Sequence, residues 1–259
     1  GGRMSAAEAV AAVRARIEAA GGDLARVRLI AVTKGHPVSA VREIVEAGVL
    51  DVGESYAQEL VAKANALDQE VRWHFIGGVQ RNKVRTIAPF VHLWQSVDRL
   101  ALAGEIARHA PGASVLVQVN VSGLEHQSGC PPERVDAVVE GCTDLGLQVR
   151  GLMAIGPQAP LDAVRAAFAS VRVLADRLGL PERSMGMSGD LQAAAATARS
   201  PRAARRPADF AGRAFDGHER RSRGGRGRGE HDGAHRHRPL RSPWRRVRRG
   251  TVVSGSGGE

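Results

Sequence analysis

The chain has 259 residues, of which 43% are hydrophobic, and this size and composition suit one large soluble domain. We find no apolar stretch long enough to cross a bilayer and no charged start leading into a secretory signal, so we expect a cytoplasmic protein without a membrane partner. Two cysteines, Cys130 and Cys142, are too few for a disulfide framework or a metal cage, and we expect two reduced thiols.

The formal net charge of +10 is confined to one end of the chain. Residues 199–259 contain seventeen arginines, no lysine and six acidic residues, and therefore carry +11, whereas residues 1–198 carry −1. This contrast predicts two parts: a folded domain over residues 1–198 and an arginine-rich, disordered tail over residues 199–259.

Apolar runs and helical periodicity alternate along the first part. Strands are predicted over 26–34, 50–55, 71–78, 91–97, 113–122, 147–156 and 183–189, and helices over 5–20, 38–48, 56–67, 80–90, 99–110, 132–146, 161–179 and 190–198. Such alternation indicates parallel strands joined by right-handed crossovers, and the continuously apolar strands fit a sheet covered on both sides. We predict an α/β fold, a TIM-type (β/α)8 barrel. A doubly wound open sheet is the competitor, but no Gly-x-Gly-x-x-Gly follows the first strand.

An eight-stranded barrel requires one more strand after residue 198. The arginine-rich segment that follows shows neither strand nor helix periodicity, so we predict that the barrel lacks its last strand. The first and seventh strands would then be exposed edges, and marginal stability is expected.

One lysine ends the first predicted strand in a chain that otherwise uses arginine. Lys34 is one of three lysines, and a lysine can lose its proton and attack an aldehyde to form an imine, which an arginine cannot do. The turn at Ser188-Gly189 opens a helix and offers N–H donors for a phosphate. Together these features suggest pyridoxal 5′-phosphate (PLP), although a lysine at a strand end can also be a solvated cap.

Six segments occur in an order that resembles a known family. They are "AVTKGHP", "VGESYAQE", "WHFIGGVQRNK", "QVNVSGLEHQSG", "GLMAIGP" and "SMGMSGDL", and they resemble the signature segments of the YggS/PROSC family, the pyridoxal phosphate homeostasis proteins. The resemblance implies the barrel of the N-terminal domain of bacterial alanine racemase. It also implies storage and delivery of PLP, without robust catalytic turnover.

The resemblance also implies roles for particular residues. Lys34 would hold PLP as a Schiff base, Ser188 and Gly189 would contribute to the phosphate site, and Asn120 and Met153 would line the cofactor ring. We assign no catalytic residue and no metal. The implied partners are PLP and PLP-dependent apo-enzymes, and a monomer is expected.

The chain departs from the family pattern most clearly at its end. Ser55 replaces an asparagine and Gln127 a common lysine, which affects local contacts only. The family continues with a strand close to "VRIGTAIFG", and nothing after Thr197 matches it. Reading a G- and C-rich gene out of frame would produce the composition of the tail. We therefore interpret residues 199–259 as the product of a frameshift. Weak cofactor affinity follows from the missing part of the site.

Two other functions remain open. A PLP-dependent racemase-like enzyme needs acid/base groups on both faces of its substrate, and Tyr56 is the single tyrosine. The segment "RRSRGGRGRG" could bind RNA through charge, but it has few aromatic residues for stacking, and we predict no specific nucleic-acid partner. His74, His92, Trp73 and Trp94 are expected in barrel packing, and Glu54 is either a general base or a structural acceptor.

Overall fold

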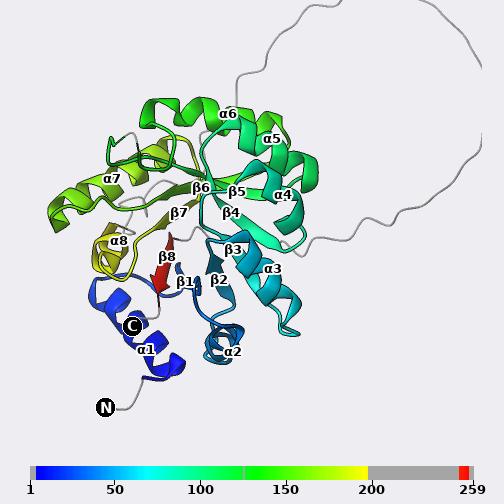
Figure 1. The fold of residues 1–259 in the computed structure, drawn as a ribbon. Coiled ribbons are helices and arrows are strands. Elements are labelled where there is room, and N and C mark those ends of the chain that lie inside the picture. The colour runs from blue at the N-terminus through cyan, green and yellow to red at the C-terminus, as the bar shows by residue number, and fades with distance from the viewer. Residues whose placement is uncertain (1–3, 125, 198–250, 257–259) are drawn as a thin grey trace, which may run out of the picture. The chain divides into compact units, whose positions relative to one another are not determined.

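The structure, a computed structural model, describes residues 4–124, 126–197 and 251–256. Eight parallel strands close into a barrel in the order of the sequence (Figure 1). The strands are β1 (Val27–Val32), β2 (Asp51–Glu54), β3 (Arg72–Phe75), β4 (Val91–Val97), β5 (Ser114–Gln118), β6 (Gln148–Ala154), β7 (Glu182–Met185) and β8 (Thr251–Ser256). The prediction of a TIM-type barrel is confirmed.

The helices follow the strands as the periodicity predicts. They are α1 (Ala6–Ala19), α2 (Val38–Glu46), α3 (Ala57–Asn65), α4 (Arg81–Ile87), α5 (Leu100–His109), α6 (Val135–Asp144), α7 (Leu161–Arg177) and α8 (Leu191–Thr197), with a 3-10 turn at Pro132–Arg134. Helix α1 begins at a capping box, in which Ser5 Oγ accepts from the Glu8 N–H and the Ser5 N–H donates to the Glu8 carboxylate. Local capping therefore sets the start of the first helix.

The strands bury both of their faces, which explains their continuous apolar character. Trp73, Phe75 and Trp94 belong to the large cluster that packs strands against helices, as predicted for the two tryptophans. Leu93 and Leu116 occupy alternating positions and join a separate small cluster with Met153. Side chains of opposite parity along β3 to β6 thus fill two different layers of a barrel.

The eighth position of the barrel corrects the prediction of a missing strand. Strand β8 pairs with β1 in parallel over Val27–Val32 and with β7 at Arg183 and Ser184, and it lies between these two strands in Figure 1. It is formed by residues 251–256, which we had placed in the tail. The physical reason is that the edges of β1 and β7 offer unpaired N–H and C=O groups, which an extended segment from elsewhere in the chain can satisfy.

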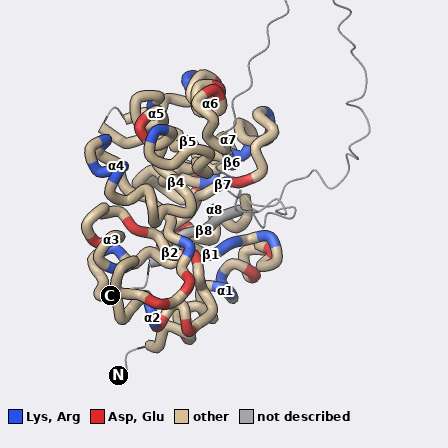
Figure 2. Tube along the Cα trace, turned by 90° about the vertical axis from the view of Figure 1, so that its right-hand side faces the viewer, with Lys and Arg blue, Asp and Glu red and all other residues tan. Residues whose placement is uncertain are grey.

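The segment between α8 and β8, residues 198–250, lies outside the described residues. Its predicted disorder and its out-of-frame origin therefore remain predictions. Figure 2 shows acidic and basic residues interspersed over the helices around the barrel, which matches the near-neutral charge of residues 1–198. Within the described ranges, none of the helices has the length and apolarity that crossing a membrane requires.

Candidate functional site

A cavity of about 300 Å³ lies at the C-terminal ends of the strands, where barrels of this type hold their ligands. Its volume falls at the lower end of the roughly 300–1,000 Å³ typical of small-molecule sites. Residues from several strand ends line it, among them Lys34 after β1, Ser55 after β2, Met153 in β6 and Ser184 in β7. The closure of the barrel therefore brings together residues that are far apart in the sequence.

Lys34 lies at the rim of this cavity with an exposed side chain. It makes no hydrogen bond or ion pair with any residue in the described part of the chain, whereas Lys63 Nζ makes three hydrogen bonds. A primary amine whose side chain has no partner in the protein is sterically available to a ligand. The structure thus places the predicted lysine where a ligand aldehyde could reach it.

A buried cluster fixes the backbone on both sides of Lys34. Lys63 Nζ donates to the Thr33 carbonyl at 2.7 Å, to Glu54 at 2.7 Å and to Glu59 at 2.9 Å. The Gly35 N–H donates to the same Glu59 carboxylate at 2.8 Å. Both peptide groups that flank Lys34 are therefore tied to one network, which holds the lysine toward the cavity.

This cluster answers the question left open for Glu54. Its carboxylate is completely buried and accepts from the Thr33 hydroxyl at 2.6 Å as well as from Lys63, so it has a structural role. The sequence reasoning missed Lys63. The available signal was its position three residues after Leu60 on the buried side of α3, a place where helices rarely carry a lysine.

A second polar network crosses the barrel interior and ends at the cavity. The Ser184 hydroxyl donates to Gln95 Oε1 at 2.6 Å, Gln95 Nε2 lies 2.7 Å from His74 Nδ1, and His74 Nε2 lies 2.8 Å from Asp51. Arg72 completes the chain with two hydrogen bonds to Asp51. Because the Ser184 hydroxyl donates its hydrogen bond to Gln95, its oxygen is available as an acceptor for a ligand at the cavity wall.

The ionisation of this network follows from burial and charge. Burial lowers the pKa of His74, although the hydrogen bond to Asp51 opposes the effect. Burial would raise the pKa of Asp51, but hydrogen bonds from Arg72 and His74 outweigh it and hold that pKa well below its usual range. His74 is then neutral, donates from Nε2 and accepts from Gln95 at Nδ1, which fixes the direction of the whole chain.

The remaining predicted site residues separate into two groups. Met153 is buried and lines the cavity together with Lys34. Asn120 does not line it in the described structure: its amide nitrogen donates to the carbonyls of Leu124 and Gln127, and its oxygen accepts from the Ser122 hydroxyl. Asn120 therefore organises its own loop.

Ser188 and Gly189 lie in the exposed turn that leads from β7 to α8. The preceding residues Gly186 and Met187 line the cavity, and the Ser188 carbonyl accepts from Arg16 of α1 at 2.9 Å. The predicted phosphate turn is thus next to the cavity, and α1 holds it in place.

The described residues contain no group of three or more His, Cys, Asp or Glu side chains that could hold a metal ion. His74 and His92 pack with ring centroids 5.8 Å apart inside the barrel, as expected for packing residues. Cys130 and Cys142 are free and buried, and burial raises the pKa of each thiol to about 11. Neither thiol is therefore poised for nucleophilic chemistry.

Comparison with known proteins gives a consistent result, although no family model matches the chain. A pyridoxal phosphate homeostasis protein of Pseudomonas aeruginosa is 47% identical over 201 residues, which cover 73% of this chain and 87% of that protein. Among solved structures, PipY of Synechococcus elongatus with PLP bound superimposes with a TM-score of 0.65 at 33% identity, covering 74% of this chain and 93% of PipY.

Alanine racemase of Clostridium difficile shares the fold alone, with a TM-score of 0.55 at 14% identity over 70% of this chain and 51% of the racemase. The resemblance seen in the six sequence segments is therefore confirmed by identity along most of the barrel. On these grounds the chain belongs to the family of pyridoxal phosphate homeostasis proteins.

Proposed function

We propose that this chain binds PLP through Lys34 and keeps the cofactor in store for other proteins. The observation that carries the proposal is the unpaired amine of Lys34 at the rim of a cavity formed by the strand ends. Family membership supports it, since the solved structure of the relative PipY contains PLP.

The residues around the cavity fit the chemical groups of the cofactor. PLP supplies an aldehyde that condenses with a primary amine, and it carries a phosphate and a polar aromatic ring. Lys34 provides the amine, Met153 an apolar wall, and Ser184 a polar group whose orientation Gln95 fixes. We place the phosphate at the turn of Ser188 and Gly189, beyond the cavity-lining Gly186.

The affinity is expected to be weak for a reason visible in the sequence. The strand that closes the barrel reads "TVVSGS", and it lacks the arginine of the segment "VRIGTAIFG" that the family resemblance implied. One charge-assisted contact with the phosphate would be absent, and such contacts contribute about 1.5–3 kcal/mol each.

Delivery fits this site better than racemisation does. A racemase requires an acid/base group on each face of its substrate. Tyr56 is 58% exposed and borders a neighbouring pocket, and it is not among the residues that line the Lys34 cavity in the described structure. We therefore propose a cytoplasmic, monomeric carrier that passes PLP to apo-enzymes. Sustained formation of D-alanine from L-alanine by the purified protein would contradict this.

Reductive trapping tests the attachment directly. The purified chain is incubated with PLP, reduced with borohydride and digested, and the modified peptide is located by mass spectrometry. We expect the label on Lys34, its loss in Lys34→Ala, and full labelling in the matched control Lys83→Ala. A label on Lys63 or Lys83, or an unchanged yield in Lys34→Ala, would overturn the proposal.

A further inference from the structure

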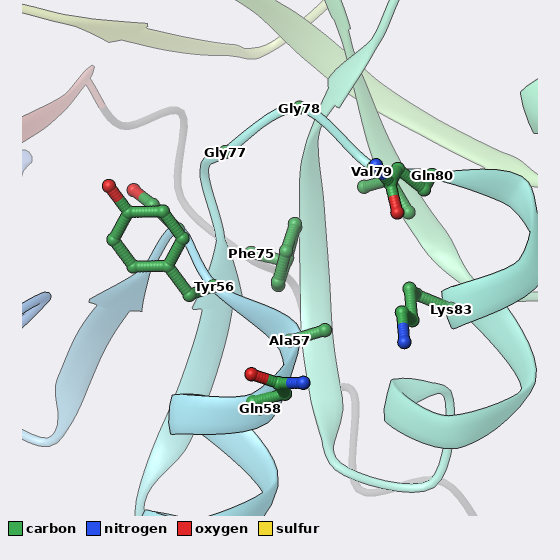
Figure 3. A pocket seen from close by; sticks show the side chains of 10 residues that line it. Tyr56, Ala57, Gln58, Phe75, Gly77, Gly78, Val79, Gln80 and Lys83 are labelled. Atoms are coloured by element: carbon green, nitrogen blue, oxygen red, sulfur yellow. The ribbon is translucent and has the colours of Figure 1, made fainter.

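A second pocket, of about 580 Å³, adjoins the Lys34 cavity. It lies between the start of α3 and α4, and Figure 3 shows Gln58 of α3 on one side of it and Lys83 of α4 on the other, with Phe75 of β3 above Gln58 in this view. Ser55, Tyr56 and Gln80 complete its polar side chains. Nothing in the chemistry proposed for Lys34 uses these groups.

The pocket carries a positive charge that no acidic group neutralises. Lys83 is half-buried, and its side chain makes no hydrogen bond or ion pair with any residue in the described ranges. No carboxylate is among the residues that line the pocket; the other polar side chains are two amides, a hydroxyl and a phenol. A lysine side chain that lines a pocket without a carboxylate is available to pair with a negatively charged ligand.

The glycine loop after β3 adds hydrogen-bond donors to the same pocket. The N–H groups of Gly77 and Gly78 donate to no acceptor in the described structure. A side chain at Gly77 would lie 2.3 Å from the Ser55 carbonyl, so glycine is needed for the close approach of the two loops, whereas Gly78 faces open space. The loop therefore adds backbone N–H groups, without an acceptor among the described residues, to the same lining that contains Lys83.

We propose that this pocket is a second binding site, which takes the oxyanion of a small ligand, a phosphate or a carboxylate, on Lys83 and on the N–H groups of Gly77 and Gly78. Gln58 and Gln80 would hold the neighbouring polar groups of the ligand. Ser55, Gly77 and Gly78 line both this pocket and the Lys34 cavity, so an occupant here lies against the wall of the first site.

The test uses inorganic phosphate and acetate as probes at constant ionic strength. Binding is followed through the amide resonances of Gly77 and Gly78 in the isotope-labelled full-length Lys34→Ala protein. Because that variant cannot attach PLP to Lys34, its result is independent of the function proposed above. The variants added to it are Lys83→Met, Lys83→Arg and, as a matched control, Arg85→Met, which removes a charge from an exposed position of α4 outside the pocket.

We expect phosphate or acetate to shift both glycine amides. Lys83→Met should weaken binding about tenfold or more, because a charge-assisted hydrogen bond is lost. Lys83→Arg and Arg85→Met should stay within about twofold of the parent. Tighter binding of phosphate than of acetate would identify a phosphate ester as the ligand class, and tighter binding of acetate a carboxylate.

Unchanged affinity in Lys83→Met, an equal loss in Arg85→Met, or shifts confined to amides outside this loop would each refute the proposal. A melting temperature equal to that of the parent shows that Lys83→Met is folded, which is expected because the Lys83 side chain makes no hydrogen bond or ion pair in the described structure that the substitution would break.

Discussion

Replacing Lys63 with methionine tests the cluster that holds Lys34. Methionine matches the length of the lysine stem but removes the ammonium that donates to Glu54, Glu59 and the Thr33 carbonyl. Glu54 is completely buried, and its second carboxylate oxygen already lacks a hydrogen-bond partner in the described structure. The substitution therefore leaves a buried carboxylate without compensation.

The expected loss follows from the burial of the pair. Breaking a buried ion pair by removing one member costs about 3–5 kcal/mol, because the remaining charge stays desolvated. For a domain of this size, each kcal/mol lowers the melting temperature by about 2–4 °C, so Lys63→Met should lower it by about 6–20 °C. Glu59 contributes less, since its side chain is 32% exposed and can be solvated.

Thermal unfolding followed by circular dichroism measures the effect, with the double variant Lys63→Met/Glu54→Gln as the control. Removing the second charge should recover part of the loss, because a neutral amide is easier to bury than a carboxylate. A melting temperature of Lys63→Met within about 2 °C of the parent, or a double variant less stable than the single one, would refute this account of the cluster.

Three further predictions concern the barrel. Burial lowers the pKa of His92 to about 4, below the ~6.5 of an unfolded chain. The contribution of His92 to the free energy of unfolding should therefore be fully present above about pH 6.5 and be lost as the pH falls toward 4. The melting temperature of His92→Gln should depend less on pH over this range than that of the parent, and an identical dependence would contradict the prediction. Cys130 and Cys142 should react with a thiol reagent only after denaturation, and rapid reaction of the native protein would contradict their burial. Gly151→Ala would place a Cβ 1.9 Å from a backbone oxygen of β7 and should lower the melting temperature strongly, whereas Gly104→Ala in open space on α5 should not, and equal effects would argue against the close approach.

The sequence alone predicted the architecture and singled out Lys34 as the candidate for a Schiff base. Alternation of apolar runs with helical periodicity reports burial on both faces of each strand, and this local signal predicted the barrel. Lys34 was recognisable because it lies two residues after the end of a strand, and barrel strands end at a common rim. Met153, near the end of β6, lines the same cavity, and its contact with a cofactor stays a prediction.

The tertiary structure decided which distant residues meet. Strand β8 comes from residues 251–256, and pairing through backbone groups carries little sequence signal that could have identified it. Lys63 reaches the Thr33 carbonyl from the next helix, and Ser184 reaches Gln95 across the barrel. The Asn120 side chain hydrogen-bonds within its own loop, to the Leu124 carbonyl, and does not line the cavity in the described structure. Spacing along the chain does not encode such contacts, because the closure of the sheet, and not sequence separation, sets which side chains face each other inside a barrel.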